Sequence, residues 1–443
     1  MKSNIFYFII LGFVLRVFVS MDKDLHDWDE KYHALVAKNL TKDWSVPKLY
    51  DQPILEYDYK SWVGNHVWLH KPPLSLYGIA VVYKIFGPSV FATRLLSILL
   101  SSLCIYFVYR IAFILFNERI ANWSSFLFAI NGFVLDLVSG RTATDHVDTM
   151  LLFWICAYIM LLLKWKDNMS YLRILVLSMV LAFGVLTKWL VMSIVLIFFG
   201  IIIIGSSNTF TKKLNYSLLH IIGASIIVLP WYLYSYLYFR QEFLYEMKMN
   251  SEHLFRVIEG HGHSMDFYFH KMRILFGEWI YIPLSLLLFL LYKEPKKKQY
   301  WIIAIWIFLP LIIFTSAQTK MQSYIGISAP AYFICTSVFI EFCKNNIQAS
   351  WMYKLIVIVI GSLAVRYCIE RLKPLQILNP HKTEYVQKGY DEHTIVFGDP
   401  EPIKTMFFEP VIASYSHIPK QGILDSIKSL NQYQIVIIDS LKQ

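Results

Sequence analysis

The sequence predicts an α-helical polytopic membrane protein with about eleven spans, on three observations. Of its 443 residues, 56% are hydrophobic and 16% are charged, whereas ordinary soluble domains contain about 25% charged residues. Apolar runs of about 18 residues or more, the length that crosses a bilayer as a helix, recur along the chain. Lysine and arginine concentrate in alternate connections, as they do in membrane proteins of fixed orientation. These features exclude a large soluble enzyme, a disordered chain, collagen and a coiled coil.

The predicted spans begin with residues 5–20. Lys2 precedes this run and no small-x-small cleavage pattern follows it, so we expect an uncleaved anchor rather than a removed signal peptide. The other ten spans are expected, to within about four residues, at 89–115, 120–138, 146–163, 171–187, 189–205, 216–238, 273–291, 300–316, 324–342 and 352–368.

The distribution of positive charge predicts the orientation of these spans. With the N-terminus inside, 14 Lys and Arg residues lie at the N-terminus or in short inner connections, and only three lie in short outer connections. This excess predicts an inner N-terminus and an outer C-terminus. The long loops 21–73 and 239–272 then lie outside. The three cations of the short outer connections are Arg141, Lys188 and Lys320.

The tail differs from the rest of the chain in composition. Residues 370–443 contain eight Lys or Arg and nine Asp or Glu, a net charge of −1, so the positive charge of the chain, +10 overall, belongs to the membrane part. Nucleic-acid binding is therefore not expected. Two β-branched runs, TIVFGDP and QYQIVIID, flank the helical pattern PKQGILDSIKSL. We predict a transmembrane domain over 1–369 and a small outer α/β domain over 370–443.

Cysteine placement excludes a disulfide framework and a cysteine zinc site, because no CxxC pair occurs. All five cysteines lie in or at the ends of apolar segments, at Cys104, Cys156, Cys335, Cys343 and Cys368.

The first outer loop holds two candidate motifs. Asp29 and Glu30 come just after the first span and open an amphipathic stretch that we expect to lie on the membrane surface as an interfacial helix. The alternative is an acidic helix start, which the helix dipole favours. In HKPPLSLY, the two prolines present Lys71 from a rigid turn. Lys71 can hold a phosphate there, or it can extend its ammonium to the membrane interface.

Further polar groups lie beside later spans. SGRTATDHVDTMLLFW places Arg141, Asp145 and Asp148 next to an apolar run, where ionisable residues are costly and often functional. A structural Arg–Asp pair is the alternative. Arg141, Lys188 and Lys320 are the exceptions to the charge rule, and each stands where a phosphate at the outer leaflet could bind.

The loop 239–272 adds four histidines. His261 and His263 have HxH spacing, which is a weak metal signal without a third ligand. Hydrogen-bonding histidines are the alternative. The other candidates of this loop are His253 and Arg256.

Seven segments occur in one order along the chain: DE followed by KYHALVAKNL, HKPPLSLYGIAVVYKIFG, ATRLLSILLS, GRTATDHVDTMLLFW, LTKWL, VLPWYLY and SAQTKMQSYIGISAPA. In this order they resemble the lipid-linked sugar transferases of the GT-C type, in the protein O-mannosyltransferase and aminoarabinose (lipid A) transferase superfamily. The resemblance covers residues from about 14 to 335. Trp189 stands where the family usually has glycine, and His70 where the aminoarabinose branch often has an acid.

The resemblance implies a glycosyltransferase of the bacterial inner membrane whose active site faces outward. The donor would be a polyprenyl-phosphate sugar and the acceptor lipid A, another glycolipid or a protein, with inversion at the anomeric carbon. An outer domain after the last span is more similar to the lipid A branch of the superfamily than to the protein O-mannosylating branch.

The resemblance also implies roles for particular residues. The expected catalytic residues are Asp29, Glu30 and Asp148. The expected donor-phosphate ligands are Lys71, Arg94, Arg141, Lys188 and Lys320. The other candidates are Asp145, His253, Arg256, His261 and Tyr324. No cofactor is certain, and a divalent metal stays open with His70, His261 and His263 as weak candidate ligands.

A function of another class is a transporter or flippase of polyprenyl-linked substrates. Transporters often contain repeated halves and interrupted helices near the midplane. Here the polar residues gather at one membrane face and no repeat is visible in the sequence, so the enzyme is favoured.

Overall fold

The computed structural model describes residues 4–61, 64–142, 145–374, 377 and 384–438. It forms two compact units, and each is described by itself. The helical unit comprises residues 1–21, 97–233 and 248–374. The mixed unit comprises residues 22–96, 234–247 and 375–443, so the first long loop and the tail share one unit.

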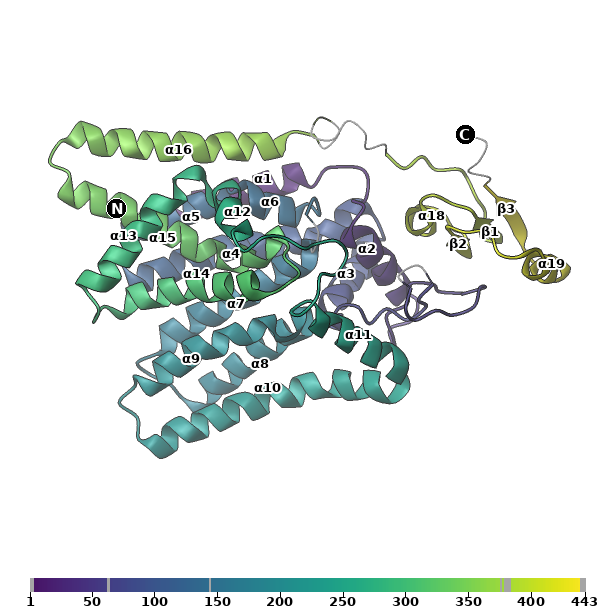
Figure 1. Ribbon diagram of the computed structural model, residues 1–443, viewed down its shortest axis with the longest axis horizontal. Coiled ribbons are helices and arrows are strands. Elements are labelled where there is room, and N and C mark those ends of the chain that lie inside the picture. The colour runs from purple at the N-terminus through teal and green to yellow at the C-terminus, as the bar shows by residue number, and fades with distance from the viewer. Residues whose placement is uncertain (1–3, 62–63, 143–144, 375–376, 378–383, 439–443) are drawn as a thin grey trace. The chain divides into compact units, whose positions relative to one another are not determined.

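The helical unit is a bundle of long apolar helices (Figure 1). Its elements, some of which continue into the other unit, are α1 (Ile5–Val19), α4 (Val90–Leu115), α5 (Glu118–Ala129), α6 (Gly132–Val138), α7 (Asp145–Trp165), α8 (Tyr171–Lys188), η1 (Trp189–Ile194), α9 (Val195–Ile204), α10 (Phe210–Tyr238), α12 (Phe267–Phe276), η2 (Glu278–Ile280), α13 (Tyr281–Lys293), α14 (Lys298–Ser316), η3 (Gln322–Ser328), α15 (Ala329–Asn346) and α16 (Ser350–Leu372).

In the described residues, seven helices are long and apolar enough to cross a membrane, or up to nine if each of two bent helix pairs is one span. Nine of the eleven predicted spans fall on these elements. The other two, 5–20 and 189–205, fall on shorter apolar helices. A further short apolar helix, Pro73–Phe86, was not predicted as a separate element. The structure therefore confirms a mostly helical protein with several helices that could span a membrane.

Two spans that we predicted as single helices, 120–138 and 273–291, are broken. α5 and α6 meet at 53°, and α12 meets the segment η2–α13 at 116°. At the first break, the Asn131 side chain accepts the amide hydrogen of Val134 and so begins a new helix. At the second break, Gly277 has φ +110, a conformation that favours glycine.

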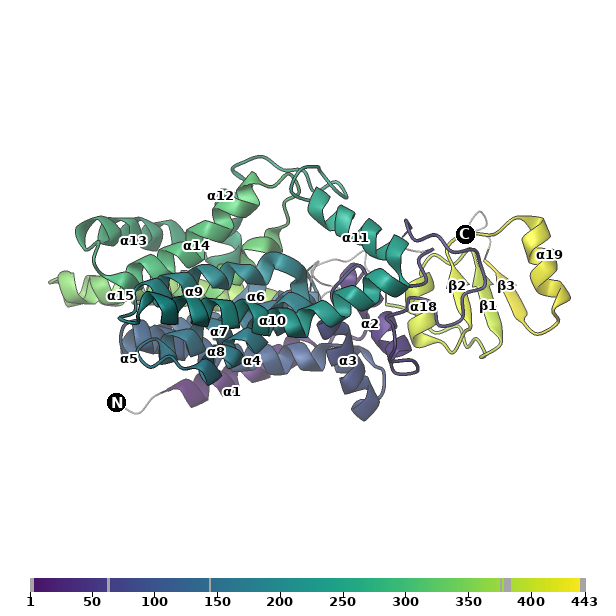
Figure 2. The same cartoon turned by 90° about the horizontal axis from the view of Figure 1, so that it is seen from below.

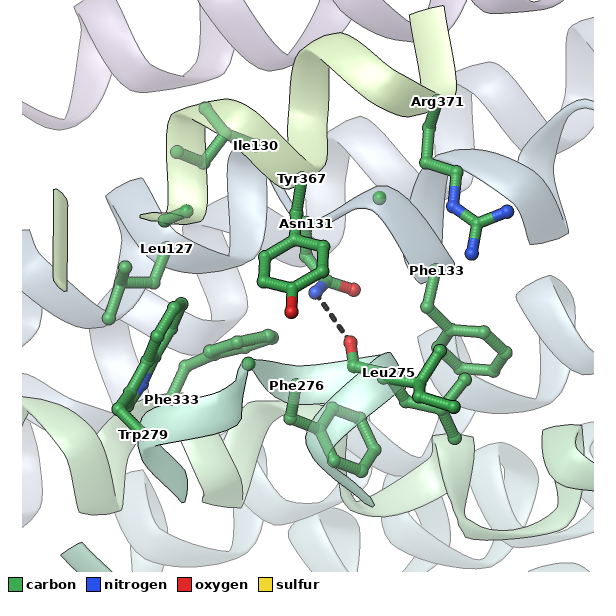
Figure 3. A pocket seen from close by; sticks show the side chains of 14 residues that line it. Leu127, Ile130, Asn131, Phe133, Leu275, Phe276, Trp279, Phe333, Tyr367 and Arg371 are labelled. Carbon is green, nitrogen blue, oxygen red and sulfur yellow. Dashed lines mark hydrogen bonds between the residues drawn. The ribbon is translucent and has the colours of Figure 1, made fainter. Parts of the chain in front are cut away.

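The two breaks are joined to each other. Asn131 Nδ2 donates to the carbonyl of Leu275 at 2.8 Å, which is the dashed bond in Figure 3. Arg16 NH1 donates to the carbonyl of Ala129 at 3.0 Å, where α5 ends. Because lipid offers no hydrogen bonds, irregular backbone at membrane depth needs such partners. A small cavity of about 20 Å³ remains beside Asn131, Tyr367 and Arg371.

The outermost helices of the bundle contribute least to its core. Of the most apolar 18-residue stretch of each helix, only 17% is buried in α10 and in α16, whereas 83% is buried in α7. Figure 1 shows α10 and α16 along opposite borders of the bundle. Their exposed apolar faces are typical of helices that contact lipid.

The mixed unit combines helices with a small sheet (Figure 2). Its helices are α2 (Asp29–Leu40), α3 (Pro73–Phe86), the first part of α11 (Arg240–Glu252), α18 (Pro402–Phe408) and α19 (Gln421–Ser429). The strands β1 (Thr394–Phe397), β2 (Ala413–Tyr415) and β3 (Gln434–Ile437) are parallel, in the order β2-β1-β3. β1 and β3 lie in the two β-branched runs of the tail, and α19 lies in the helical pattern between them.

The stretch after Glu30 forms a helix, α2, that is mostly buried within its unit, and its expected position at the membrane surface stays a prediction. Figures 1 and 2 both show α18 beside this helix, α2. Eight of its twelve residues are buried, namely Glu30, His33, Ala34, Leu35, Val36, Ala37, Asn39 and Leu40. The amphipathic pattern predicted a one-sided helix, but segments distant in sequence cover the other side as well.

We predict that Gly326→Ala destabilises the helical unit while Gly361→Ala does not. A Cβ at Gly326 would lie 2.6 Å from Cε1 of the buried Phe133 ring, and such overpacking costs about 1–3 kcal/mol. A Cβ at Gly361 meets nothing within 4 Å. Thermal unfolding of the detergent-solubilised variants measures the difference, and equal melting temperatures would contradict this packing.

Candidate active site

The mixed unit places Asp29 and Lys71 together. Asp29 is the first residue of α2, and Lys71 precedes the two prolines that begin α3. Lys71 Nζ lies 3.3 Å from Asp29 Oδ2, and each side chain is 14% exposed. The Pro-Pro turn that the sequence singled out therefore directs its lysine to the first candidate acid.

His70 connects this pair to a third segment. Its Nε2 lies 3.2 Å from Lys71 Nζ, and its Nδ1 lies 3.1 Å from Glu246 Oε2 on α11. Glu246 is buried, and no local pattern in the sequence marked it as a partner of this site. The resulting chain of groups runs Asp29, Lys71, His70, Glu246.

The ion pair determines the charge of Asp29. Burial acts to raise the pKa of Asp29, but the Lys71 ammonium and the nearby His33 and His70 rings hold it well below its usual range. Asp29 is therefore a carboxylate at neutral pH and a weak proton acceptor.

Glu30 and Arg94 form a buried pair next to Asp29. Arg94 Nε donates to Glu30 Oε1 at 2.7 Å and Arg94 NH2 to Glu30 Oε2 at 2.9 Å. Both side chains are 0% exposed. These bonds hold the loop in position, and the catalytic role expected for Glu30 and the phosphate-binding role expected for Arg94 stay predictions.

The same guanidinium fixes the approach to Asp29. Arg94 also donates to the carbonyls of Asp22 at 2.7 Å and Asp24 at 2.8 Å. From the other side, Lys404 Nζ on α18 lies 2.8 Å from Asp24 Oδ2 and 3.2 Å from Asp27 Oδ1. No local pattern marked Lys404 as part of this site, because it is 380 positions from Asp24.

The helical unit brings together a second acid and lysine. Lys188, the last residue of α8, forms an ion pair with Asp148 on α7. The Lys188 ammonium also lies 5.4 Å from the centre of the Tyr324 ring, a cation–π contact. Three sequence candidates, Asp148, Lys188 and Tyr324, therefore meet.

Trp189, the residue after Lys188, departs from the family pattern in residue type but not in backbone conformation. Trp189 has φ 41, in the region that favours glycine. This is the position where glycine is usual, so the turn after α8 retains the glycine conformation at the cost of local strain.

Lys320 lies in a turn covered by the second long loop. It is 4% exposed, and its Nζ donates to the carbonyl of Ala317 at 2.6 Å. The backbone amides of Thr319 and Lys320 donate to the carbonyls of His253 at 3.1 Å and His261 at 2.9 Å. His253, Arg256 and His261 are thus brought to this turn through backbone contacts, since the carbonyl of Arg256 also accepts from Thr319 Oγ1 at 2.8 Å.

The structure describes a side-chain contact of Arg141 but not the side chain of Asp145. Arg141 NH1 donates to the carbonyl of Arg371 at 2.6 Å, near the end of α16. Asp136, which the sequence analysis did not consider, pairs with Arg371 at 3.2 Å. Asp145 begins α7, and its side chain lies outside the described part of the structure.

The weak metal candidates do not form a site. Among the described residues, no group of three or more His, Cys, Asp or Glu side chains could hold a metal ion. His70 contacts Glu246 and Lys71, whereas His263 stacks on Phe267 with ring centres 4.2 Å apart.

Comparisons with known proteins agree with the motifs. Residues 70–234 match the family described as dolichyl-phosphate-mannose-protein mannosyltransferase. An undecaprenyl phosphate-α-4-amino-4-deoxy-L-arabinose arabinosyl transferase of Pseudomonas fluorescens is 22% identical over 60% of this chain and 48% of its own length. The corresponding enzyme 2 of Proteus mirabilis is 25% identical over 67% of this chain and 52% of its own length. The chain thus spans about half the length of these relatives.

Solved structures show the same fold. ArnT from Cupriavidus metallidurans bound to undecaprenyl phosphate has a TM-score of 0.64 at 18% identity, over 80% of this chain and 63% of that one. The oligosaccharyltransferase AglB of Archaeoglobus fulgidus, in complex with an inhibitory peptide and a dolichol-phosphate, has a TM-score of 0.63 at 13% identity, over 93% and 64%. These structures show the fold alone, and it is the family and relative matches together with them that confirm the resemblance to the protein O-mannosyltransferase and aminoarabinose transferase superfamily.

We predict that Glu30→Gln costs much more stability than Glu341→Gln. Removing the Glu30 charge leaves Arg94 charged and buried, which typically costs about 3–5 kcal/mol. Glu341 pairs with Arg119 at 2.8 Å, but that arginine is 41% exposed, and exposed pairs contribute about 0.2–1 kcal/mol. Melting temperatures of the two purified variants test this, and similar small losses would show that the Arg94 pair does not hold the loop.

Proposed function

We propose that this chain, a relative of the GT-C glycosyltransferases, moves a sugar from a polyprenyl-phosphate donor to lipid A or another glycolipid. We place the reaction on the outer side of a bacterial inner membrane. The single observation that supports it most is the Asp29–Lys71 pair, 3.3 Å apart at the Pro-Pro turn of the family motif.

The names of its relatives support the donor class. Two relatives are named as transferases that use undecaprenyl phosphate-linked aminoarabinose. Two structural neighbours are described with undecaprenyl phosphate and with dolichol-phosphate. A polyprenyl phosphate is the chemical feature that these descriptions share, and we extend it to this chain.

The proposed step is a displacement at the anomeric carbon. An acceptor oxygen forms a bond to this carbon while the bond to the donor phosphate oxygen breaks, and the bonding electrons leave with the polyprenyl phosphate. Lysine ammonium groups stabilise the charge that develops on this phosphate. Lys71 is the first candidate, and Lys188 and Lys320 remain candidates from the helical unit. A one-step displacement inverts the anomeric carbon.

The charge of Asp29 narrows the choice of acceptor. A general base works best when its pKa lies near the working pH, whereas the pKa of Asp29 is held well below its usual range by Lys71 despite the opposing effect of burial. A phosphate oxygen of a glycolipid is already an anion and needs no base. We therefore favour a phosphorylated glycolipid, with Asp29 orienting Lys71 and the sugar.

Asp29→Asn and Lys71→Ala should reduce the formation of a sugar adduct on lipid A or another glycolipid about a hundredfold or more. Loss of a group that stabilises developing charge typically lowers the rate by about 10²–10³. Mass spectrometry of lipid A and of total glycans, from cells with and without the chain, detects the adduct and identifies the sugar. Lys428→Ala, on the exposed face of α19, is the control and should leave the adduct intact.

Other outcomes of this experiment separate the alternatives. A sugar lost from a glycoprotein, with lipid A unchanged, would move the acceptor to protein. No change in any glycan, in cells that contain the folded chain and its donor lipid, would contradict the enzyme and favour a transporter.

Lys71→Met should raise the pH at which activity falls on the acid side. The pKa of Asp29 is lower in the folded protein than in the unfolded chain, where it is about 3.9. Ionised Asp29 therefore contributes stability at a pH above about 3.9, and this contribution is lost as the pH falls through the pKa of the folded state. Without Lys71, burial remains and the pKa rises. The test is the residual transfer activity of the variant from about pH 4 to 8, the range over which a shifted carboxylate pKa is visible. If its activity falls at the same acid pH as that of the unaltered chain, the pairing is contradicted.

A further inference from the structure

A large cleft in the mixed unit lies away from the Asp29–Lys71 pair. It has a volume of about 850 Å³, within the range of about 300–1,000 Å³ that is usual for small-molecule sites. One wall is the last turn of α2 with residues 49–52, and the other wall belongs to the tail. Lys38 and Asn39 of α2 lie on the first wall.

The fold explains why this space is open. Residues 392–393, 410–412 and 432–433 line it, and they immediately precede β1, β2 and β3. All three parallel strands therefore begin at this cleft. The loops at this edge of the sheet form its rim, and α18 ends at its side.

The polar groups of the first wall are held in place by other contacts. Lys38 Nζ donates to the carbonyls of Met406 at 2.9 Å and Phe407 at 2.8 Å, which uses two of its three donors. Asn39 Nδ2 donates to the carbonyls of Lys48 and Leu49, which leaves the amide oxygen to accept.

Another fixed pair adds groups of both signs. Lys42 Nζ donates to Asp51 Oδ2 at 2.7 Å, and these side chains are 58% and 25% exposed. Lys42 retains further donors and Asp51 a further acceptor oxygen. On the opposite wall, Glu409 accepts from the backbone amide of Tyr390 at 3.2 Å.

The mixture of groups selects among ligand classes. Two ammonium groups, Lys38 and Lys42, and three carboxylates, Asp51, Glu392 and Glu409, line the cleft, so neither a phosphate nor a cation is favoured. Donors and acceptors side by side suit hydroxyl groups, because each hydroxyl can donate and accept. The apolar lining, which suits the C–H faces of a sugar ring, is Leu35, Leu49, Met406, Val411, Ile412 and Tyr433.

We propose that this cleft binds the carbohydrate part of the glycolipid acceptor. The inference rests on the proposed function, because it assigns the cleft to the substrate of the Asp29–Lys71 site. Asp29 begins α2 and Lys38 lies nine residues later, which corresponds to roughly 14 Å along a helix. A glycan of more than one sugar can extend over this distance, so the cleft would select acceptors by a sugar remote from the reacting oxygen.

Saturation-transfer NMR on the full chain in detergent tests the binding. The probes are glucose, mannose, N-acetylglucosamine and β-linked disaccharides of glucose and N-acetylglucosamine, with inorganic phosphate for comparison. At least one sugar should bind saturably, and Val411→Trp, which fills the cleft, should weaken that binding at least tenfold. Val386→Trp is the matched control, because Val386 belongs to the same tail, is 77% exposed and does not line the cleft.

The outcomes separate this inference from the proposed function. Asp29→Asn should bind the sugar as the unaltered chain does, and Val411→Trp should raise the acceptor KM at least tenfold with kcat unchanged. Sugar binding without any transfer activity would sink the proposed function and keep the cleft as a carbohydrate site. Three outcomes with folded protein would overturn the inference. The chain could bind none of the probes, or it could bind phosphate in preference to sugars. The Val411→Trp variant could also bind sugar as well as the unaltered chain.

Discussion

The buried pair of Arg94 and Glu30 is the interaction on which the rest of the site depends. The Arg94 guanidinium bonds both oxygens of Glu30 and the carbonyls of Asp22 and Asp24. Removing either charge would leave the other buried and uncompensated, which is far more costly than losing an exposed pair. The loop from Asp22 to Glu30 is therefore held in one conformation, and Asp29 next to Glu30 inherits its position from that constraint.

The tail contributes to the same constraint. Lys404 on α18 is 3% exposed and pairs with Asp24 and Asp27, the acidic part of the loop. Lys38, further along α2, donates to carbonyls where α18 ends, a favourable place for a cation. Contacts at both ends of α18 therefore join the tail to α2, so the tail is a structural part of the unit that contains Asp29.

The sequence predicted what depends on local pattern and missed what depends on distant contacts. Long apolar runs predicted helices such as α7 and α8, and the Pro-Pro turn predicted a fixed Lys71. Hydropathy averages over a break, so the helix end at Asn131 was not visible in 120–138. The pairing of Lys404 with Asp24 joins residues 380 positions apart, and no spacing rule reaches that far. The burial of α2 was missed for the same reason, because the segment that covers it lies in the tail.

The ion pair of Asp29 and Lys71 also limits what each residue can do. A buried carboxylate is costly without a partner, and Lys71 supplies that partner. A phosphate that binds Lys71 would share its ammonium and so weaken the hold on Asp29, which would then move toward its usual pKa. The two residues consequently act as a unit, and a substitution of Lys71 removes a phosphate ligand and changes the carboxylate together. Effects of residues that act as a unit do not add, so the loss measured at Lys71 exceeds the worth of its contact with the phosphate alone.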